Sequence, residues 1–165
     1  MKKIIYCHEN SVYKVVFESR FIQQILQYCQ KKMPLETGGI LVGKYTEDGC
    51  SAEITFITGP PSDSKHTRQS FYRGTKELNL WLTDSWSKGE YYLGEWHFHP
   101  NSSSNPSYVD KRQMKLISTD SNYNCPEPIL LIIGGDPKKI WTSSCFVFPR
   151  KKSIIMLNDE VIINI

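Results

Sequence analysis

The chain has 165 residues, 39% of them hydrophobic and 12% aromatic, which is typical of one globular domain with a sizeable core. Its net charge of +3 and its scattered basic residues do not indicate a nucleic-acid partner. No apolar run approaches the ~20 residues of a membrane span, and no apolar segment of a signal peptide follows the N-terminal lysines. The five scattered cysteines favour a reducing compartment over a disulfide framework. We therefore expect a single cytoplasmic domain over residues 1–165, with no membrane partner.

The first half of the chain predicts short strands around one amphipathic helix. Apolar residues recur at helical spacing between residues 20 and 32, and a proline follows that segment. Strand patterns before and after the helix are separated by turn residues and end in a polar loop. The expected elements are strands 2–7 and 12–17, helix 20–32, a hairpin of strands 39–45 and 52–58 with its turn at 47–49, and the loop 59–69.

The second half continues the α/β alternation. Apolar residues at helical spacing predict two further helices, and aromatic or continuous apolar runs predict the strands between and after them. The expected elements are helix 75–87, strand 91–98, helix 107–118, and strands 128–134, 141–148 and 153–157.

Two histidines one residue apart stand at the end of the aromatic strand. Side chains on a strand alternate between its faces, so His97 and His99 point the same way. Pro100 is expected to end the regular pairing, and Ser107 and Asp110 lie where the next helix begins. Two imidazoles and one carboxylate occupy three corners of a tetrahedron around zinc and leave the fourth for water. That open position is what a hydrolytic zinc site requires.

Simpler interpretations exist for each of these residues. Ser107 followed three residues later by Asp110 is also a helix-capping pattern. A single histidine on a strand is most simply a core residue, and we expect His8 and His66 to be surface residues because neither has a partner at ligand spacing. The chain has only four histidines, however, and two share one strand face just before a carboxylate. This conjunction favours a metal site.

The spacing of these residues resembles the motif of the JAMM metalloproteases, also called the JAB or MPN family. The motif is completed by a glutamate far upstream, before a glycine-rich strand, and the resemblance covers roughly residues 10 to 150. In this sequence the matching positions are Glu36, His97, His99, Pro100, Ser107 and Asp110. The resemblance implies an α/β fold, a mixed β-sheet flanked by helices in a single domain.

The resemblance also implies a role for each of the five polar positions. It assigns Zn²⁺ to His97, His99 and Asp110, the general base to Glu36, and donation to the oxyanion to Ser107. Outside that resemblance, Glu36 would be an ordinary solvated glutamate. The family usually has serine or threonine where this chain has Phe98, and the side chain there points away from the metal face. We therefore expect Phe98 to change packing and not metal ligation.

The resemblance implies a protein substrate. JAMM enzymes mostly cut isopeptide or peptide bonds after the C-terminus of ubiquitin or a ubiquitin-like protein. The compact form here, with Glu95 and Trp96 before the first histidine, is similar to bacterial stand-alone members. Some of these accompany E1–E2-like conjugating enzymes, as in the CBASS antiphage operons, where the peptidase removes a conjugated nucleotidyltransferase. Strand 39–45 or loop 59–69 would hold the partner's extended tail as an added strand.

Two other functional classes remain open at this point. One is a non-catalytic MPN scaffold, although scaffolds usually lose ligands and all five positions are present here. The other is a hydrolase that releases a small amine or amino acid from a carrier protein. The short loops after Asp110 would suit such a small substrate.

Overall fold

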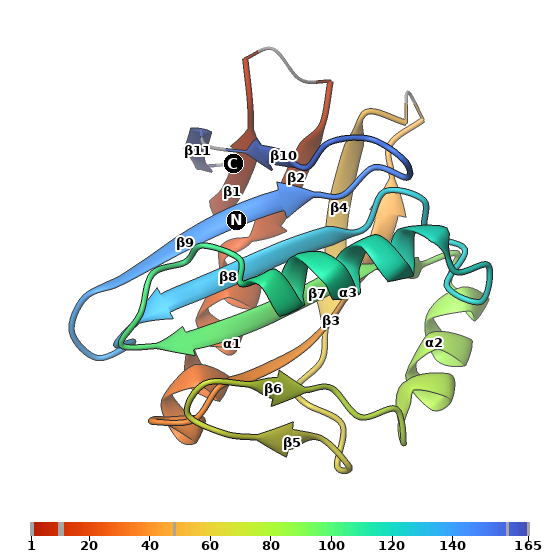
Figure 1. Cartoon of the computed structure of the whole chain (residues 1–165). Helices are drawn as coiled ribbons and strands as arrows, with labels where there is room; N and C mark the ends of the chain where they lie inside the picture. Colours follow the sequence, from red (N-terminus) through yellow and green to blue (C-terminus); the bar gives the residue numbers. More distant parts are fainter. Residues whose placement is uncertain (1, 10–11, 48, 158, 165) are drawn as a thin grey trace.

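The computed structural model describes residues 2–9, 12–47, 49–157 and 159–164. Within these ranges nine strands form one mixed sheet, and two short strands form a separate hairpin (Figure 1). In spatial order the sheet comprises β10 (Ile155–Leu157), β9 (Trp141–Val147), β8 (Ile129–Gly135), β7 (Tyr91–Pro100), β3 (Thr37–Tyr45), β4 (Ser51–Ile57), β2 (Lys14–Glu18), β1 (Lys2–Cys7) and β11 (Asp159–Asn164). The hairpin comprises β5 (Lys65–His66) and β6 (Phe71–Tyr72).

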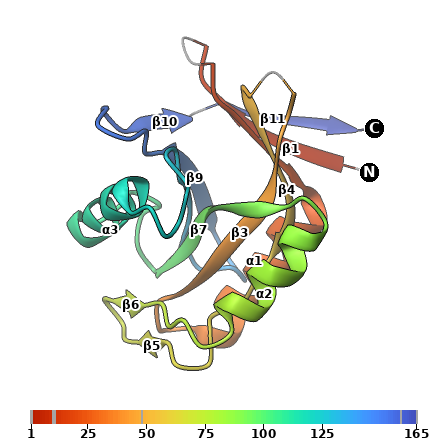
Figure 2. The ribbon, with the colours of Figure 1, turned by 90° about the vertical axis from the view of Figure 1, so that its right-hand side faces the viewer.

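Helices cover both faces of the sheet (Figure 2). On one face α1 (Ser19–Lys32) buries its apolar stripe against the sheet in the larger core cluster. On the other face α3 (Tyr108–Thr119) and α2 (Leu78–Ser87) pack in a second cluster. The central strands are thus buried between helical layers, which explains why β8 is almost continuously apolar and why β7 is buried along most of its length.

The central strand β7 has a neighbour on each side, and glycines stand next to both histidines. β3 pairs with it antiparallel and sets Gly38 opposite His97, while β8 pairs with it parallel and sets Gly134 opposite His99. A Cβ on Gly38 would lie 2.6 Å from the Phe71 ring and 3.0 Å from the His97 ring. One on Gly134 would collide with the backbone of the loop after β7. Both glycines therefore leave room for segments that approach the histidines.

The expected fold class is confirmed: an α/β arrangement with a mixed sheet flanked by helices. The expected hairpin is β3–β4, and its turn includes Asp48, which lies outside the described residues. α2 begins at Leu78 and not at residue 75. The Asp63 carboxylate accepts hydrogen bonds from the backbone N–H groups of Thr75 and Lys76, at 3.1 Å each, and holds them in a turn.

One strand extends beyond its expected end, and one strand was not expected at all. β7 continues through Pro100, which pairs by register with Gly135 of β8. Proline is tolerated there because the β3 ladder already ends at Phe98, so no backbone N–H is needed on that side. The last strand, β11, was not predicted, and it pairs antiparallel with β1. It opens with two acidic residues, which have low strand propensity.

The expected docking position on strand 39–45 is wrong. This segment belongs to β3, which lies between β7 and β4 in the sheet. Residues 39–43 pair with β7 and residues 41–45 pair with β4, so neither side of the segment offers a continuous free edge. The loop expected over residues 59–69 contains β5, which within the described residues pairs with β6 alone. A free strand edge therefore exists on this hairpin and not on β3.

None of the described helices has the length and apolarity required to span a bilayer. No disulfide joins the cysteines of the described residues, and Cys29, Cys125 and Cys145 are buried.

Candidate active site

The three predicted metal ligands converge on one point of the sheet. His97 and His99 project from the same face of β7, and Asp110 reaches them from the first turn of α3. His97 Nδ1 lies 2.9 Å from Asp110 Oδ1, and His99 Nε2 lies 3.3 Å from Asp110 Oδ2. All three residues are less than 9% exposed. The alternation of the strand and the start of the helix thus bring together residues that are 13 positions apart.

The donor set of this cluster fits a metal ion. Two ligands about 2.0–2.1 Å from a tetrahedral zinc lie roughly 3.3 Å apart, which is the spacing of the His99–Asp110 pair. No three His, Cys, Asp or Glu side chains among the described residues are already spaced as ligands around one ion. His97 and Asp110 instead hydrogen-bond directly, and a separation greater by about 0.4 Å would give them ligand spacing.

The electrostatics of the cluster favour a cation. Burial acts to raise the pKa of the Asp110 carboxyl, but hydrogen bonds from His97 and His99 hold it well below its usual range. Burial acts to lower the pKa of His97, yet its hydrogen bonds to Asp110 and Glu95 raise it to about 9. Two carboxylates therefore stabilise a positive charge at this buried position, which is also what a metal cation requires.

Ser107 and Asp110 form a complete capping box. The Ser107 Oγ accepts a hydrogen bond from the Asp110 backbone N–H at 3.1 Å, and Asp110 Oδ2 accepts one from the Ser107 backbone N–H at 2.7 Å. The cap therefore aims the Asp110 carboxylate at the histidines, so the capping geometry is compatible with the expected ligand role of this residue. The Ser107 hydroxyl acts as an acceptor in the cap, which leaves its proton free to donate.

Glu36 lies directly before β3 and is brought to the cluster by the pairing of β3 with β7. Its backbone N–H donates to the Thr67 carbonyl oxygen at 2.8 Å, which fixes the chain at this position. Its side chain is half-buried and interacts electrostatically with His97, His99 and Asp110. Burial raises the pKa of Glu36, and the nearby His99 opposes this rise. A carboxyl with a raised pKa is suited to accept and release a proton near neutral pH.

His66 is not the surface residue that the sequence predicts. It is half-buried, and its Nδ1 lies 2.9 Å from the Glu36 carbonyl oxygen. Its ring packs on Phe71 with centroids 5.1 Å apart, and Phe71 meets the His97 ring edge-on at 5.7 Å. The β5–β6 hairpin therefore borders the cluster. The sequence contains no indication of this position, because His66 lies about 30 residues before His97 and meets the cluster only through the folding of the hairpin.

Two further charged residues stand behind His97. Glu95 Oε2 accepts a hydrogen bond from His97 Nε2 at 3.0 Å, and Glu95 Oε1 accepts one from Arg73 Nε at 2.7 Å. Glu95 and Arg73 are buried. Glu95 precedes His97 by two positions, so strand alternation could have placed it on the same face. Arg73 gave no comparable sequence signal.

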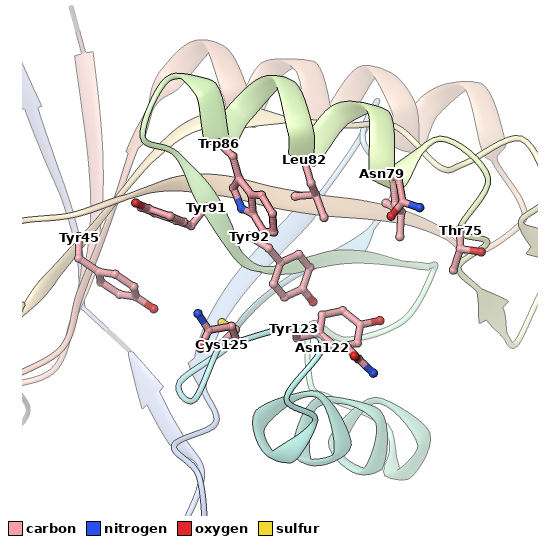
Figure 3. Close-up of a pocket in the computed structure, with 12 residues that line it drawn as sticks. Tyr45, Thr75, Asn79, Leu82, Trp86, Tyr91, Tyr92, Asn122, Tyr123 and Cys125 are labelled. Carbon is pink, nitrogen blue, oxygen red and sulfur yellow. The ribbon is translucent and has the colours of Figure 1, made fainter.

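A cavity of about 500 Å³ lies in another part of the described structure, away from the histidine cluster. It lies between α2, the start of β7 and the segment after α3, and Figure 3 shows Tyr92 and Tyr123 together in its wall. None of the five predicted site residues lines it. The Tyr123 hydroxyl accepts a hydrogen bond from Arg73 at 2.7 Å, and the Tyr92 hydroxyl donates one to Glu95 at 3.3 Å. The cavity wall therefore contacts the buried ion pair and not the histidines.

Phe98 packs away from the histidines, as expected. It is fully buried in the core cluster on the α1 face. We predict that Phe98→Ser lowers the free energy of unfolding by about 3–5 kcal/mol, because truncating a buried phenylalanine leaves a cavity. Metal stoichiometry should not change. Denaturant unfolding and metal analysis of the folded variant measure the two effects, and loss of metal from a folded Phe98→Ser protein would contradict the prediction.

Comparisons with known proteins point to one family. The family described as "Prokaryotic homologs of the JAB domain" matches residues 18–144. A protein of Enterobacter hormaechei named "CD-NTase/cGAS isopeptidase" is 41% identical over 98% of this chain and 90% of its own length. "Probable metalloprotease y4qB" of Sinorhizobium fredii is 30% identical over 71% of this chain and 73% of its own.

The fold has a counterpart among solved structures. The solution structure of protein DSY2949 from Desulfitobacterium hafniense superposes with a TM-score of 0.63. The match covers 85% of this chain and 87% of that protein, at 19% identity.

Proposed function

We propose a deconjugating isopeptidase activity for this chain, which belongs to the prokaryotic JAB-domain family of metalloproteases. The resemblance drawn from the motif is thereby confirmed. The observation that carries the proposal is the 41% identity to a CD-NTase/cGAS isopeptidase, which extends over 98% of the chain. The substrate is accordingly a protein of the CD-NTase/cGAS class, joined through its C-terminus to an amine.

Membership of a metalloprotease family implies a metal ion, and we infer that it is zinc, held by His97, His99 and Asp110. The convergence of two imidazoles and one carboxylate supports this assignment. Bound zinc lowers the pKa of a water molecule to about 7, which makes hydroxide available at neutral pH. With three protein ligands, the ion would keep one coordination position for water.

The remaining site residues act on the proton and on the carbonyl oxygen. The Glu36 carboxylate accepts a proton from the attacking water and transfers it to the leaving amine, consistent with its raised pKa. The Ser107 hydroxyl donates to the carbonyl oxygen as negative charge develops there, while its oxygen stays in the cap. His66 and Phe71 restrict access from the hairpin side.

Ser107 offers a way to separate capping from catalysis. We expect Ser107→Ala to lower turnover about 10²–10³-fold and stability by about 1 kcal/mol. Ser107→Asp should keep the cap, because aspartate is an equally good N-cap residue, and still lose turnover, because a carboxylate has no proton to donate. Ser107→Thr retains both groups and is the matched control. Turnover and thermal unfolding are measured on all three, and a fully active Ser107→Asp enzyme would exclude the donor role.

The partner's tail is proposed to bind at the β5–β6 hairpin. The free edge of this hairpin lies beside the site and offers backbone groups for an added strand. Because the Phe71 ring lies against His97, we expect small residues, glycine or alanine, next to the scissile bond. We further propose that an E1–E2-like enzyme of the same CBASS-type antiphage system makes the conjugate, and that the reaction takes place in the cytoplasm.

A C-terminal fusion of a CD-NTase to a small reporter protein tests this function. We expect one cut at the junction, loss of cutting with a zinc chelator, and recovery on adding zinc. Replacing the last CD-NTase residue by tryptophan should abolish cleavage, whereas alanine should preserve it. Cutting that persists under the chelator, or that occurs in unfolded proteins without regard to a C-terminal tail, would refute the proposal. Cleavage of free dipeptides alone would indicate the small-substrate hydrolase instead.

A further inference from the structure

A buried chain of charges stands behind one histidine of the cluster. Arg73 Nε donates to Glu95 Oε1 at 2.7 Å, and His97 Nε2 donates to Glu95 Oε2 at 3.0 Å. The Arg73 and Glu95 side chains are 3% and 0% exposed. The remaining guanidinium contacts are a donation to the Gly74 carbonyl oxygen at 3.1 Å and one to the Tyr123 hydroxyl at 2.7 Å. The reaction proposed above assigns no role to Arg73 or Glu95.

The carboxylates on either side of His97 favour one orientation of its ring. Its Nδ1 faces Asp110 and its Nε2 faces Glu95. A half-turn about the Cβ–Cγ bond would exchange each nitrogen for a carbon, so Asp110 Oδ1 and Glu95 Oε2 would both lose the hydrogen bond that they share with His97. The Glu95 carboxylate can only accept hydrogen bonds, so Nε2 must carry the proton that it donates to Glu95. In the neutral imidazole the free lone pair is therefore on Nδ1, which faces the cluster.

We propose that Arg73 and Glu95 are positioning residues, which hold the His97 ring and its proton so that Nδ1 faces the metal ion. The inference rests on the proposed metal site and adds the identity of the ligating nitrogen. A carboxylate behind a metal-ligating histidine typically fixes the ring and makes it a better ligand. Arg73 keeps Glu95 in place as an acceptor, because its Nε–H occupies the other carboxylate oxygen.

The single variant Glu95→Gln has a specific expected defect. Arg73 still requires an acceptor, so the amide oxygen turns toward Arg73 and the amide NH₂ turns toward His97. His97 Nε2 must then accept, which moves the ring proton to Nδ1 and opposes metal binding. We expect zinc affinity to fall about 10–100-fold, measured by competition with a chromophoric chelator.

A matched pair of double variants separates positioning from stability. Arg73→Met with Glu95→Gln and Arg73→Met with Glu95→Met both remove the two buried charges together. They differ in one respect, since the glutamine can turn its oxygen toward His97 and the methionine offers no such acceptor. We expect similar melting temperatures for both apoproteins, with zinc bound at least about tenfold more tightly by the glutamine form.

The tautomer of His97 gives an independent readout. In zinc-loaded protein, ¹⁵N NMR of the histidine ring should show a protonated Nε2 and a metal-bound Nδ1. Equal zinc affinities for the two double variants, or an Nε2-ligated His97 in the wild type, would overturn the inference while leaving the metal site intact. Failure of the wild type to bind zinc, or undiminished binding by His97→Ala, would overturn the proposed function as well.

Discussion

Replacing His97 and His99 together by alanine is expected to abolish stoichiometric zinc binding and all turnover. The two imidazoles supply two of the three proposed ligands, and Asp110 alone cannot hold the ion at micromolar concentrations of free zinc. The Asp110 carboxylate would also lose the two hydrogen-bond donors that hold its pKa below the usual range. Elemental analysis after gel filtration gives the zinc content, and the fusion-cleavage assay gives the turnover.

His66→Ala is the matched control for this experiment. His66 is also a histidine beside the site, but its Nδ1 contacts the Glu36 carbonyl oxygen and not the cluster. Zinc content of the control should equal that of the wild type. Stoichiometric zinc retained by the His97→Ala, His99→Ala protein would rule out the ligand assignment, whatever its activity.

The second large effect is expected from Glu36→Ala. In the proposed mechanism Glu36 acts on the proton and is not a ligand, so the variant should keep its zinc and its fold and lose turnover. General acid–base catalysis typically contributes about 10²–10⁴-fold, so a loss of that size is expected. Glu36→Gln should behave in the same way, since the amide keeps the shape of the side chain and cannot take the proton.

Glu47→Ala serves as the control, because Glu47 is exposed near the β3–β4 turn and none of the contacts described for the cluster involves it. Its turnover and zinc content should match those of the wild type. An active Glu36→Ala enzyme would exclude the general-base role. Loss of zinc from that variant would instead indicate that Glu36 belongs to the ligand set.

Local sequence patterns were sufficient to predict the faces of β7 and the start of α3. Alternation along the strand put His97 and His99 on one face, and the same rule placed Phe98 in the opposite core. The capping pattern alone predicts the start of α3, and thereby the position of Asp110 at its first turn. These features depend on residues within about a dozen positions of one another, where backbone geometry leaves few choices.

The predictions were wrong where contacts with distant segments of the chain determine the local backbone structure. α2 starts late because the Asp63 carboxylate holds the two residues where the helix was expected to begin. β3 cannot take a partner's tail because its own neighbours fill both edges. Strand order in a sheet follows from pairings between distant segments, and these are not visible in the pattern of a single strand.

The sequence by itself determined the family motif, the alternation that aligns two histidines, and the cap that orients a carboxylate beside them. Tertiary structure alone decided what surrounds this cluster. The register of β3 on β7 brings Glu36 to the histidines across 60 intervening residues, and the β5–β6 hairpin adds His66 and Phe71. Arg73 pairs with Glu95 because the fold buries both charges, and a buried charge without a partner is strongly destabilising. Such contacts arise from long-range pairing and desolvation, which have no period along the chain.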